Sequence, residues 1–326
     1  NFLSGDNLTI TSLANITSSF NSSTGSLVLA GNATLSQYEI ALESLSFLQN
    51  TDNPTNYGAN IQREIQYLLY DSSGNGESLS LTLTVNASND VPVIGTLNST
   101  ATFTENGSSQ SVDSTLTLSD VDNLYIQGAN ITISVNAVSL DILNSTVGVT
   151  SITSSYNSST YLLTLSGNDS LANYETVLES ITFSNNSENP DNYGTQINRL
   201  LSYEVYDTEG NSSVEFSSLA INAVNDKPSF SLFDNISTYT EGSANIAVDT
   251  TLTLSDIDST HLSTANIIIS ANFLSGDNLI VSLGNSGLNS SFDASQGVLS
   301  LAGTATLAVY ESVLETLSYS SNNENP

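Results

Sequence analysis

The chain repeats itself with a period of 136 residues, and this repetition constrains its fold more than any other feature. Tyr57 matches Tyr193 and Asp71 matches Asp207 at that interval, with further matches between them. The opening stretch "NFLSGDNL" also recurs at residues 272–279. A fixed period is typical of a protein that uses one structural unit several times.

The repeats do not divide the chain into whole units. With junctions at "SNDVP" and "VNDKP", residues 91–226 form one complete repeat. Residues 1–90 then correspond to the later part of the preceding repeat, and residues 227–326 to the earlier part of the next. Because the two end pieces overlap in sequence, we interpret the chain as a segment of a longer array that continues beyond Pro326.

Alternation of apolar and polar residues dominates each unit. The stretch "ESLSLTLTV" places Leu79, Leu81, Leu83 and Val85 on one face, as a half-buried strand requires. Such strands are separated by clusters of Ser, Asn, Gly and Asp, and no long helical pattern interrupts them. The pattern predicts an all-β fold of tandem antiparallel β-sandwich domains.

One short helix per unit is predicted from "SLANYETVLES", near residues 170–179, and from its copies in both end pieces. Ser170, Thr34 and Thr306 stand at the N-cap position of the three copies. The apolar residues of the helix recur at helical spacing and are expected to pack under the sandwich. Glu175 is expected on the solvated face.

The charge balance narrows the range of partners. There are 33 acidic residues against three basic ones, which gives a net charge of −30. Such a surface repels nucleic acid and anionic lipid headgroups, and it attracts divalent cations. The chain has no cysteine, which excludes disulfides and thiolate metal sites, and no apolar run approaches the length of a membrane span.

Acidic residues and asparagines recur at fixed places outside the strands and predict a calcium site at each junction. A single aspartate in a turn usually caps its own backbone, and this alternative explains any one position but explains the whole set poorly. In a sandwich these loops can meet at one pole, where clustered carboxylates need a cation. The predicted metal ligands are Asn89, Asp90, Glu105, Asp120, Asp122, Asp207, Asn225, Asp226, Glu241, Asp256 and Asp258.

The ordered series of motifs resembles the cadherin-like repeats of large bacterial surface adhesins. It runs from a Glu in "FTEN", through "SDVD" with an aliphatic strand and "VYDTEG", to "AVNDKPSF". The resemblance implies extracellular sandwiches joined end to end, with calcium stiffening each junction. It also implies two ligand groups: Asn89, Asp90, Glu105, Asp120, Asp122 and Asp207 at the first junction, and Asn225, Asp226, Glu241, Asp256 and Asp258 at the second.

The chain departs from the family pattern in its linkers. Ala87 and Ala223 occupy the first Asp position of the cadherin linker motif, and the acidic segment that precedes the later strands has no convincing counterpart. Fewer carboxylates imply fewer ions, since affinity follows ligand charge. One or two calcium ions per junction are expected.

Two classes of function remain open. The first is a structural element at the cell surface or outside the cell, either the stalk of an adhesin or the body of a filament, whose partners are neighbouring copies of the same repeat. The alternative is a module whose loops bind a glycan or a protein. A glycosidase is not excluded by residue types, but carboxylates repeated once per unit favour a scaffold over an enzyme, and the lone His261 is expected in a solvated loop.

Asparagine glycosylation is a further expectation. The sequon Asn-x-Ser/Thr occurs fifteen times, a modest excess over chance, and some sequons recur at one repeat position, such as Asn21 with Asn157 and Asn32 with Asn168. Attached N-linked glycans would favour a eukaryotic source.

Overall fold

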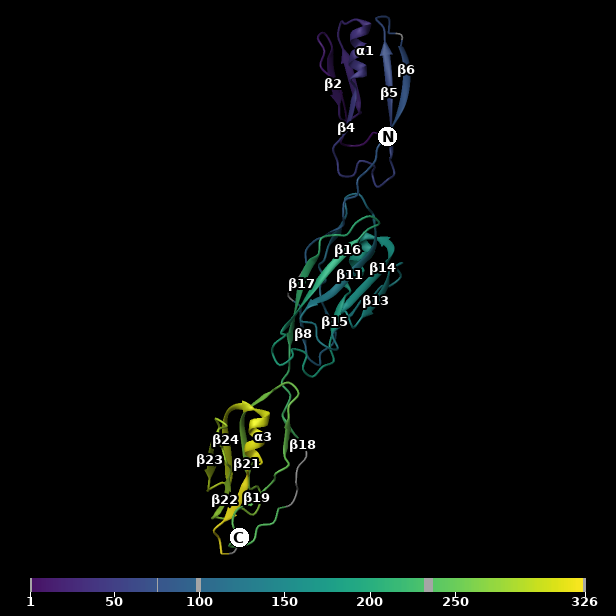
Figure 1. Cartoon of the computed structure of the whole chain (residues 1–326). Coiled ribbons are helices and arrows are strands. Elements are labelled where there is room, and N and C mark those ends of the chain that lie inside the picture. The colour runs from purple at the N-terminus through teal and green to yellow at the C-terminus, as the bar shows by residue number, and fades with distance from the viewer. Residues whose placement is uncertain (1, 75, 98–100, 232–236, 325–326) are drawn as a thin grey trace.

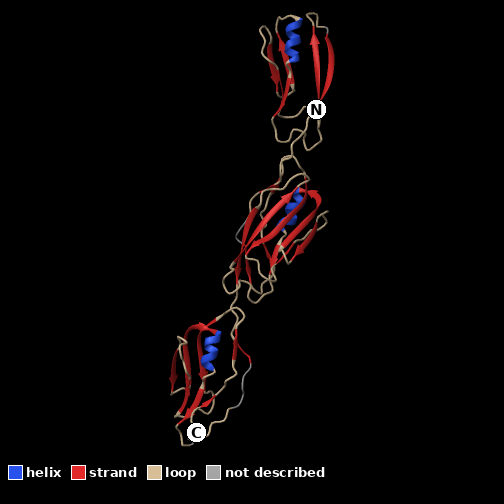
Figure 2. Cartoon of the chain, viewed as in Figure 1, coloured by secondary structure: helices blue, strands red, loops and turns tan. Residues whose placement is uncertain are grey.

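The computed structural model describes residues 2–74, 76–97, 101–231 and 237–324 (Figure 1). Pro326, beyond which the chain is expected to continue, lies outside the described residues. The described chain is mostly strand, with three short helices, as Figure 2 shows. The predicted all-β class with one short helix per unit is therefore confirmed. None of these helices is long and apolar enough to span a bilayer.

The elements gather into three units that follow one another in Figure 1, and we call them the first, middle and last units. The first unit contains β1 (Asp6–Thr9), β2 (Thr17–Asn21), β3 (Ser26–Ala30), α1 (Leu35–Glu43), β4 (Ser46–Gln49), β5 (Gln62–Tyr70) and β6 (Gly76–Thr84). Its strands pair as β1 with β4, β2 with β3, and β5 with β6.

The middle unit holds the largest sheet. Its elements are β7 (Val93–Ile94), β8 (Ala101–Thr104), β9 (Gln110–Ser111), β10 (Leu118–Ser119), β11 (Tyr125–Val135), β12 (Ile142–Asn144), β13 (Thr153–Asn157), β14 (Leu162–Ser170), α2 (Leu171–Glu179), β15 (Thr182–Ser184), β16 (Asn198–Tyr206) and β17 (Glu215–Asn222). Six strands pair in the order β13-β14-β11-β16-β17-β8, and three more in the order β12-β15-β9. All neighbours are antiparallel except β8, which runs parallel to β17.

The last unit repeats the strand arrangement of the earlier part of the middle unit. Its elements are β18 (Ser229–Ser231), β19 (Ile246–Ala247), β20 (Thr253–Ser255), β21 (His261–Ile268), β22 (Asp277–Ile280), β23 (Asn289–Asp293), β24 (Val298–Thr306), α3 (Leu307–Leu314) and β25 (Ser318–Ser321). The order β21-β24-β23 matches β11-β14-β13 of the middle unit, and β19-β25-β22 matches β9-β15-β12.

A single apolar core holds the middle unit together. It extends from Ile94 to Ile221 and contains the rings of Phe103 and Phe183, which pack edge to face at 5.2 Å. The last unit has two smaller buried clusters instead of one. In the first unit Leu69 on β5 is 52% exposed, whereas its counterpart Val205 on β16 is fully buried. Burial is thus most complete in the middle unit.

The helices begin where the sequence predicts. The hydroxyls of Thr34, Ser170 and Thr306 accept hydrogen bonds from the backbone N–H three residues later, which confirms all three N-caps. The expectation for Glu175 is wrong. Its side chain lies against the sandwich and accepts the backbone N–H of Leu118 on β10 at 2.8 Å.

Candidate metal centre

The direction of β8 determines where Glu105 lies. Since β8 runs parallel to β17, both strands end at the same edge, and Glu105 follows β8 directly beside the start of the linker. Its N–H donates to the carbonyl of Asn222 at 3.0 Å, and its Oε2 accepts the N–H of Val224 at 2.7 Å. The grouping of Glu105 with Asp90 and Asp207 at the first junction is therefore wrong, because Glu105 belongs to the second junction.

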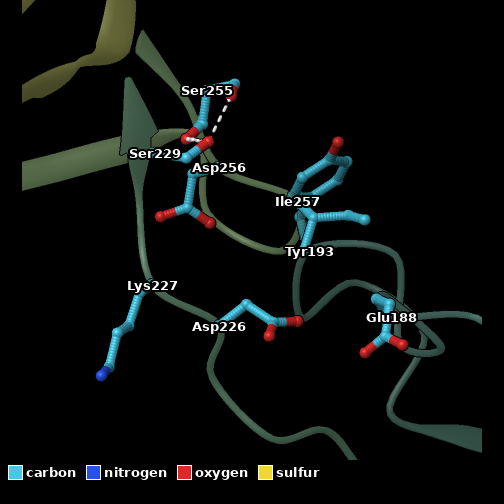
Figure 3. A pocket seen from close by; sticks show the side chains of 8 residues that line it. All are labelled: Glu188, Tyr193, Asp226, Lys227, Ser229, Ser255, Asp256 and Ile257. Carbon is cyan, nitrogen blue, oxygen red and sulfur yellow. Dashed lines mark hydrogen bonds between the residues drawn. The ribbon is translucent and has the colours of Figure 1, made fainter. Parts of the chain in front are cut away.

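Three carboxylates meet at this second junction. Oxygen atoms of Glu105, Glu188 and Asp226 all lie within 4.8 Å of one another. Glu105 is buried, and Glu188 accepts a hydrogen bond from Asn106 at 3.0 Å. Figure 3 shows Asp226 extending from the linker toward Glu188. Among the described residues, this is the one group of three or more carboxylate or histidine side chains whose ligand atoms lie this close together.

Glu188 was not among the predicted ligands. The signal that could have revealed it is an acidic residue at one place in every repeat, since Asp52, Glu188 and Glu324 each precede an Asn-Pro pair. The change from Asp to Glu and the turn-like Asn-Pro context conceal this recurrence.

The loop between β20 and β21 brings two more carboxylates to the second junction. Asp258 accepts the N–H of Asp226 at 2.8 Å, so the last unit contacts the linker directly. Asp256 accepts the N–H groups of Asp258 at 3.3 Å and Ser259 at 2.9 Å, and thereby shapes its own turn. Asp256 thus has the capping role that the turn alternative describes, while Asp258 reaches back to the linker.

Burial and like charge act together on these groups. Burial raises the pKa of Glu105, and the charges of Asp226, Glu188 and Asp258 raise it further, against the opposing hydrogen bond from Val224. Burial likewise raises the pKa of Asp258, and Asp256 adds to this effect. One oxygen on each of Glu105, Asp226 and Asp258 is buried and has no hydrogen-bond partner. Buried, unpaired carboxylate oxygens are costly unless a cation lies against them.

The first junction has a more amide-rich arrangement. Asn123 donates from Nδ2 to the Oδ1 of Asn89 at 2.7 Å and to Asp207 at 3.2 Å, and Asn89 donates to Asp207 at 3.0 Å. Asp122 accepts the N–H of Asp90 at 3.2 Å, which parallels the bond between Asp258 and Asp226. The linker is therefore tied to the middle unit by both an amide network and a backbone contact.

Asp120 shapes the loop of the first junction as Asp256 shapes that of the second. Its Oδ1 accepts the N–H groups of Asp122 at 3.1 Å and Asn123 at 2.8 Å. Its other oxygen is buried without a partner. Burial and the neighbouring Asp122 raise the pKa of Asp120, although the two backbone hydrogen bonds oppose them.

Two predicted ligands lie apart from these groups. Asn225 is exposed, and its side chain donates to the carbonyl of the following residue. Glu241 is exposed in the loop after Tyr239, whose hydroxyl donates to the carbonyl of Ser321 at the end of β25. The placement of Glu241 at the second junction is wrong for the same reason as that of Glu105, its counterpart one period earlier.

An open pocket of about 580 Å³ lies between the middle and last units (Figure 3). Its walls are formed by Glu188, Tyr193, Asp226, Lys227, Ser229, Ser255, Asp256 and Ile257. His261, the single histidine, is exposed, and its ring nitrogen Nδ1 lies 2.8 Å from the hydroxyl of Thr260. Its exposure agrees with the expectation from sequence, but the expected loop is wrong, because His261 is the first residue of β21.

No protein-family model and no curated protein matches the chain. Among solved structures, the chain is similar to the protocadherin GammaB4 extracellular domain, with 12% identity and a TM-score of 0.27 over 92% of this chain and 38% of that one. It is also similar to EC21-23 of human CDH23, with 14% identity and a TM-score of 0.30 over 92% of this chain and 80% of that one. Domains 4 and 5 of the S-layer protein SbsC match at 11% identity and a TM-score of 0.24, covering 67% of this chain and 98% of theirs. The chain thus spans well under half of the protocadherin chain, and these similarities are too distant to indicate what it binds.

Proposed function

We propose that the chain is part of a structural repeat array outside the cell or on its surface, forming an adhesin stalk or a filament body, in which calcium at the junctions stiffens the chain. In this proposal residues 91–226 form a complete cadherin-like repeat, flanked by the later part of one repeat (1–90) and the earlier part of the next (227–326). The observation that carries the proposal is the convergence of Glu105, Glu188 and Asp226 at the second junction.

The donor atoms fit calcium. Every candidate ligand offers oxygen, and hard oxygen donors from carboxylates and amides are the type that Ca²⁺ prefers. The unpartnered buried oxygens of Glu105, Asp226 and Asp258 are directed neither to a backbone N–H nor to a side-chain donor. A bound cation would satisfy these oxygens and neutralise their mutual repulsion. We propose one or two ions at each junction.

The ligands come from three separate segments, and this explains how they stiffen the joint. Glu105 and Glu188 belong to the body of the middle unit, Asp226 to the linker, and Asp258 to the loop that opens the last unit. When a bound cation is shared by all four carboxylates, it holds the linker against both units. The first junction would use Asp90, Asp120, Asp122 and Asp207 with Asn89 in the same way.

Glycans are a second proposed feature of the surface. The sequon asparagines Asn15, Asn21, Asn32, Asn144, Asn157 and Asn168 all have exposed side chains, so they are accessible to a modifying enzyme. Mass spectrometry of the native material, before and after removal of N-linked glycans, tests whether they are occupied.

A chelator experiment tests the role of calcium. Small-angle scattering and melting temperature are measured on the full chain with excess EDTA and during a calcium titration, with an Asp120→Ala, Asp122→Ala variant in parallel. We expect calcium to narrow the range of chain conformations seen by scattering. It should also raise the free energy of unfolding by RT ln(1 + [Ca²⁺]/Kd), about 2.7 kcal/mol at a hundredfold excess over Kd. If the wild type keeps its shape and melting point in EDTA, the aspartates only form turns and the calcium proposal fails.

A further inference from the structure

A loop at the base of the middle unit has an unusual backbone. Asn192, Tyr193 and Gly194 are three consecutive residues with φ values of 51°, 58° and 74°. Positive φ is unfavourable for a bulky side chain and persists only where the surroundings impose it. The same conformation recurs one period earlier, at Asn56 and Tyr57. The repeat therefore maintains this loop in spite of its strain.

The core of the unit fixes the loop at both ends. Arg199, fully buried and paired with Asp141 at 2.6 Å, donates to the carbonyl of Pro190 at 2.6 Å and to that of Gln196 at 2.9 Å. Within the loop, Asn189 accepts the N–H of Tyr193 at 2.8 Å. Such a loop presents its side chains from a rigid base.

The outer side of this loop meets the next unit. The Nδ2 of Asn189 donates to the carbonyl of Ile257 at 3.0 Å, and Ile257 is the middle residue of the Asp-x-Asp loop of the last unit. Tyr193 and Ile257 line the same pocket, as Figure 3 shows. Both side chains are about half exposed, at 49% and 52%, although each is large and apolar in part. Neither this hydrogen bond nor the side chains of Tyr193 and Ile257 involve a carboxylate.

We propose that the loop 189–194 is a docking surface for the Asp-x-Asp loop of the following repeat, and that it orients the joint without metal. Its partner is defined by two features: a carbonyl that accepts the Asn189 amide, and an apolar side chain at the middle position of Asp-x-Asp. Because both are uncharged, this contact persists in a chelator and in high salt, where a calcium-mediated contact is lost.

The first junction provides an internal comparison. It has the same loop, with Tyr57, and an apolar residue, Val121, at the middle of its Asp-x-Asp sequence, and each is 44% exposed. Among the described residues, however, Asn53 makes no hydrogen bond equivalent to that of Asn189; it only accepts the N–H of Tyr57 at 2.9 Å. The two junctions thus share these components, and among the described residues only the second has the hydrogen bond that joins the loop to the Asp-x-Asp sequence.

The test measures the rigidity of each junction separately in EDTA. The chain has no cysteine, so spin labels can be attached to introduced cysteines at exposed positions: Ser108→Cys with Ala308→Cys across the second junction, and Ala59→Cys with Ala172→Cys across the first. We expect pulsed electron resonance to give a narrower distance distribution for the second junction than for the first. Equal widths in the two junctions would overturn the proposal.

Substitutions then test whether the loop 189–194 causes the narrower distance distribution of the second junction. Tyr193→Gly removes the ring at a position where glycine relieves the strain, so the fold of the unit is retained. We expect it to abolish the narrow distribution in EDTA, while its matched control Tyr57→Gly leaves the first junction unchanged. Ile257→Ser should have the same effect, and the two changes together should broaden the distribution no more than either alone, because they remove one contact.

An unchanged width in Tyr193→Gly or additive effects of the two substitutions would contradict the docking proposal. Calcium titration of the same labelled chains keeps the two proposals distinguishable. Failure of calcium to narrow either junction counts against the metal, whereas the comparison in EDTA concerns only the loop.

Discussion

At the scale of single residues, the two recurring arginines neutralise buried aspartates. Arg63 pairs with Asp6 and Arg199 with Asp141, in each case across more than 50 residues of sequence. Both pairs are buried at 2.6 Å. The third copy of the aspartate, Asp277, accepts the hydroxyl of Tyr319 at 2.6 Å. A buried charge is thus compensated by whichever donor the fold brings to it.

Arg199→Ala should strongly destabilise the middle unit. It leaves Asp141 buried without its counter-charge, although Val138 and Asn185 still donate to it. Breaking a buried pair in this way typically costs about 3–5 kcal/mol. The substitution also removes the donor to the carbonyl of Pro190 in the loop 189–194. The measurement is calorimetric unfolding of the full chain. The double variant Arg199→Met, Asp141→Leu should recover part of the loss, because both charges are removed together, while the Val138 N–H and the Asn185 amide lose their acceptor. A cost below about 1 kcal/mol for the single variant would show that the pair matters little.

At the scale of elements, the periodicity of the sequence was sufficient to predict strands and helices, but it did not predict how the strands pair. Alternation and N-cap residues predicted the strands and placed the helix near 170–179, where α2 spans Leu171–Glu179. The position of Glu105 could not be predicted the same way, because it depends on β8 running parallel to β17. Local sequence carries no record of that parallel pairing. The same limit applies to Glu175, whose partner on β10 lies 57 residues earlier.

Glu175→Ala should lower the stability of the middle unit. It removes the acceptor for the N–H of Leu118 and leaves a partly buried donor without a partner, at a cost of about 1–3 kcal/mol. The matched control is Glu39→Ala, since Glu39 occupies the same place in α1 but is exposed. Thermal unfolding of both variants checks this expectation. Equal effects of the two substitutions would mean that helix propensity, and not the bond to β10, accounts for the loss.

At the scale of the whole molecule, the two junctions combine the same kinds of residue differently. At the first junction, amides of Asn89 and Asn123 lie between the carboxylates and share Asp207. At the second, Glu105, Glu188 and Asp226 face one another with unpartnered oxygens. The second junction should therefore depend more strongly on a cation, and the proposed contact of the loop 189–194 should keep the units oriented in a chelator.

Glu188→Gln should change stability in opposite directions with and without calcium. In EDTA the substitution removes one of three close negative charges, so the melting temperature should rise, with a gain on the order of 1 kcal/mol because solvent screens partly exposed charges. In calcium the same substitution removes a charged ligand, so the metal should bind more weakly and the calcium-dependent gain in melting temperature should shrink. Glu324→Gln is the matched control, since it occupies the same repeat position but is exposed at the far end of the last unit, and it should change neither value. A variant that is less stable than wild type in EDTA would mean that Glu188 contributes a favourable contact of its own, such as its bond from Asn106, and that repulsion does not dominate the junction.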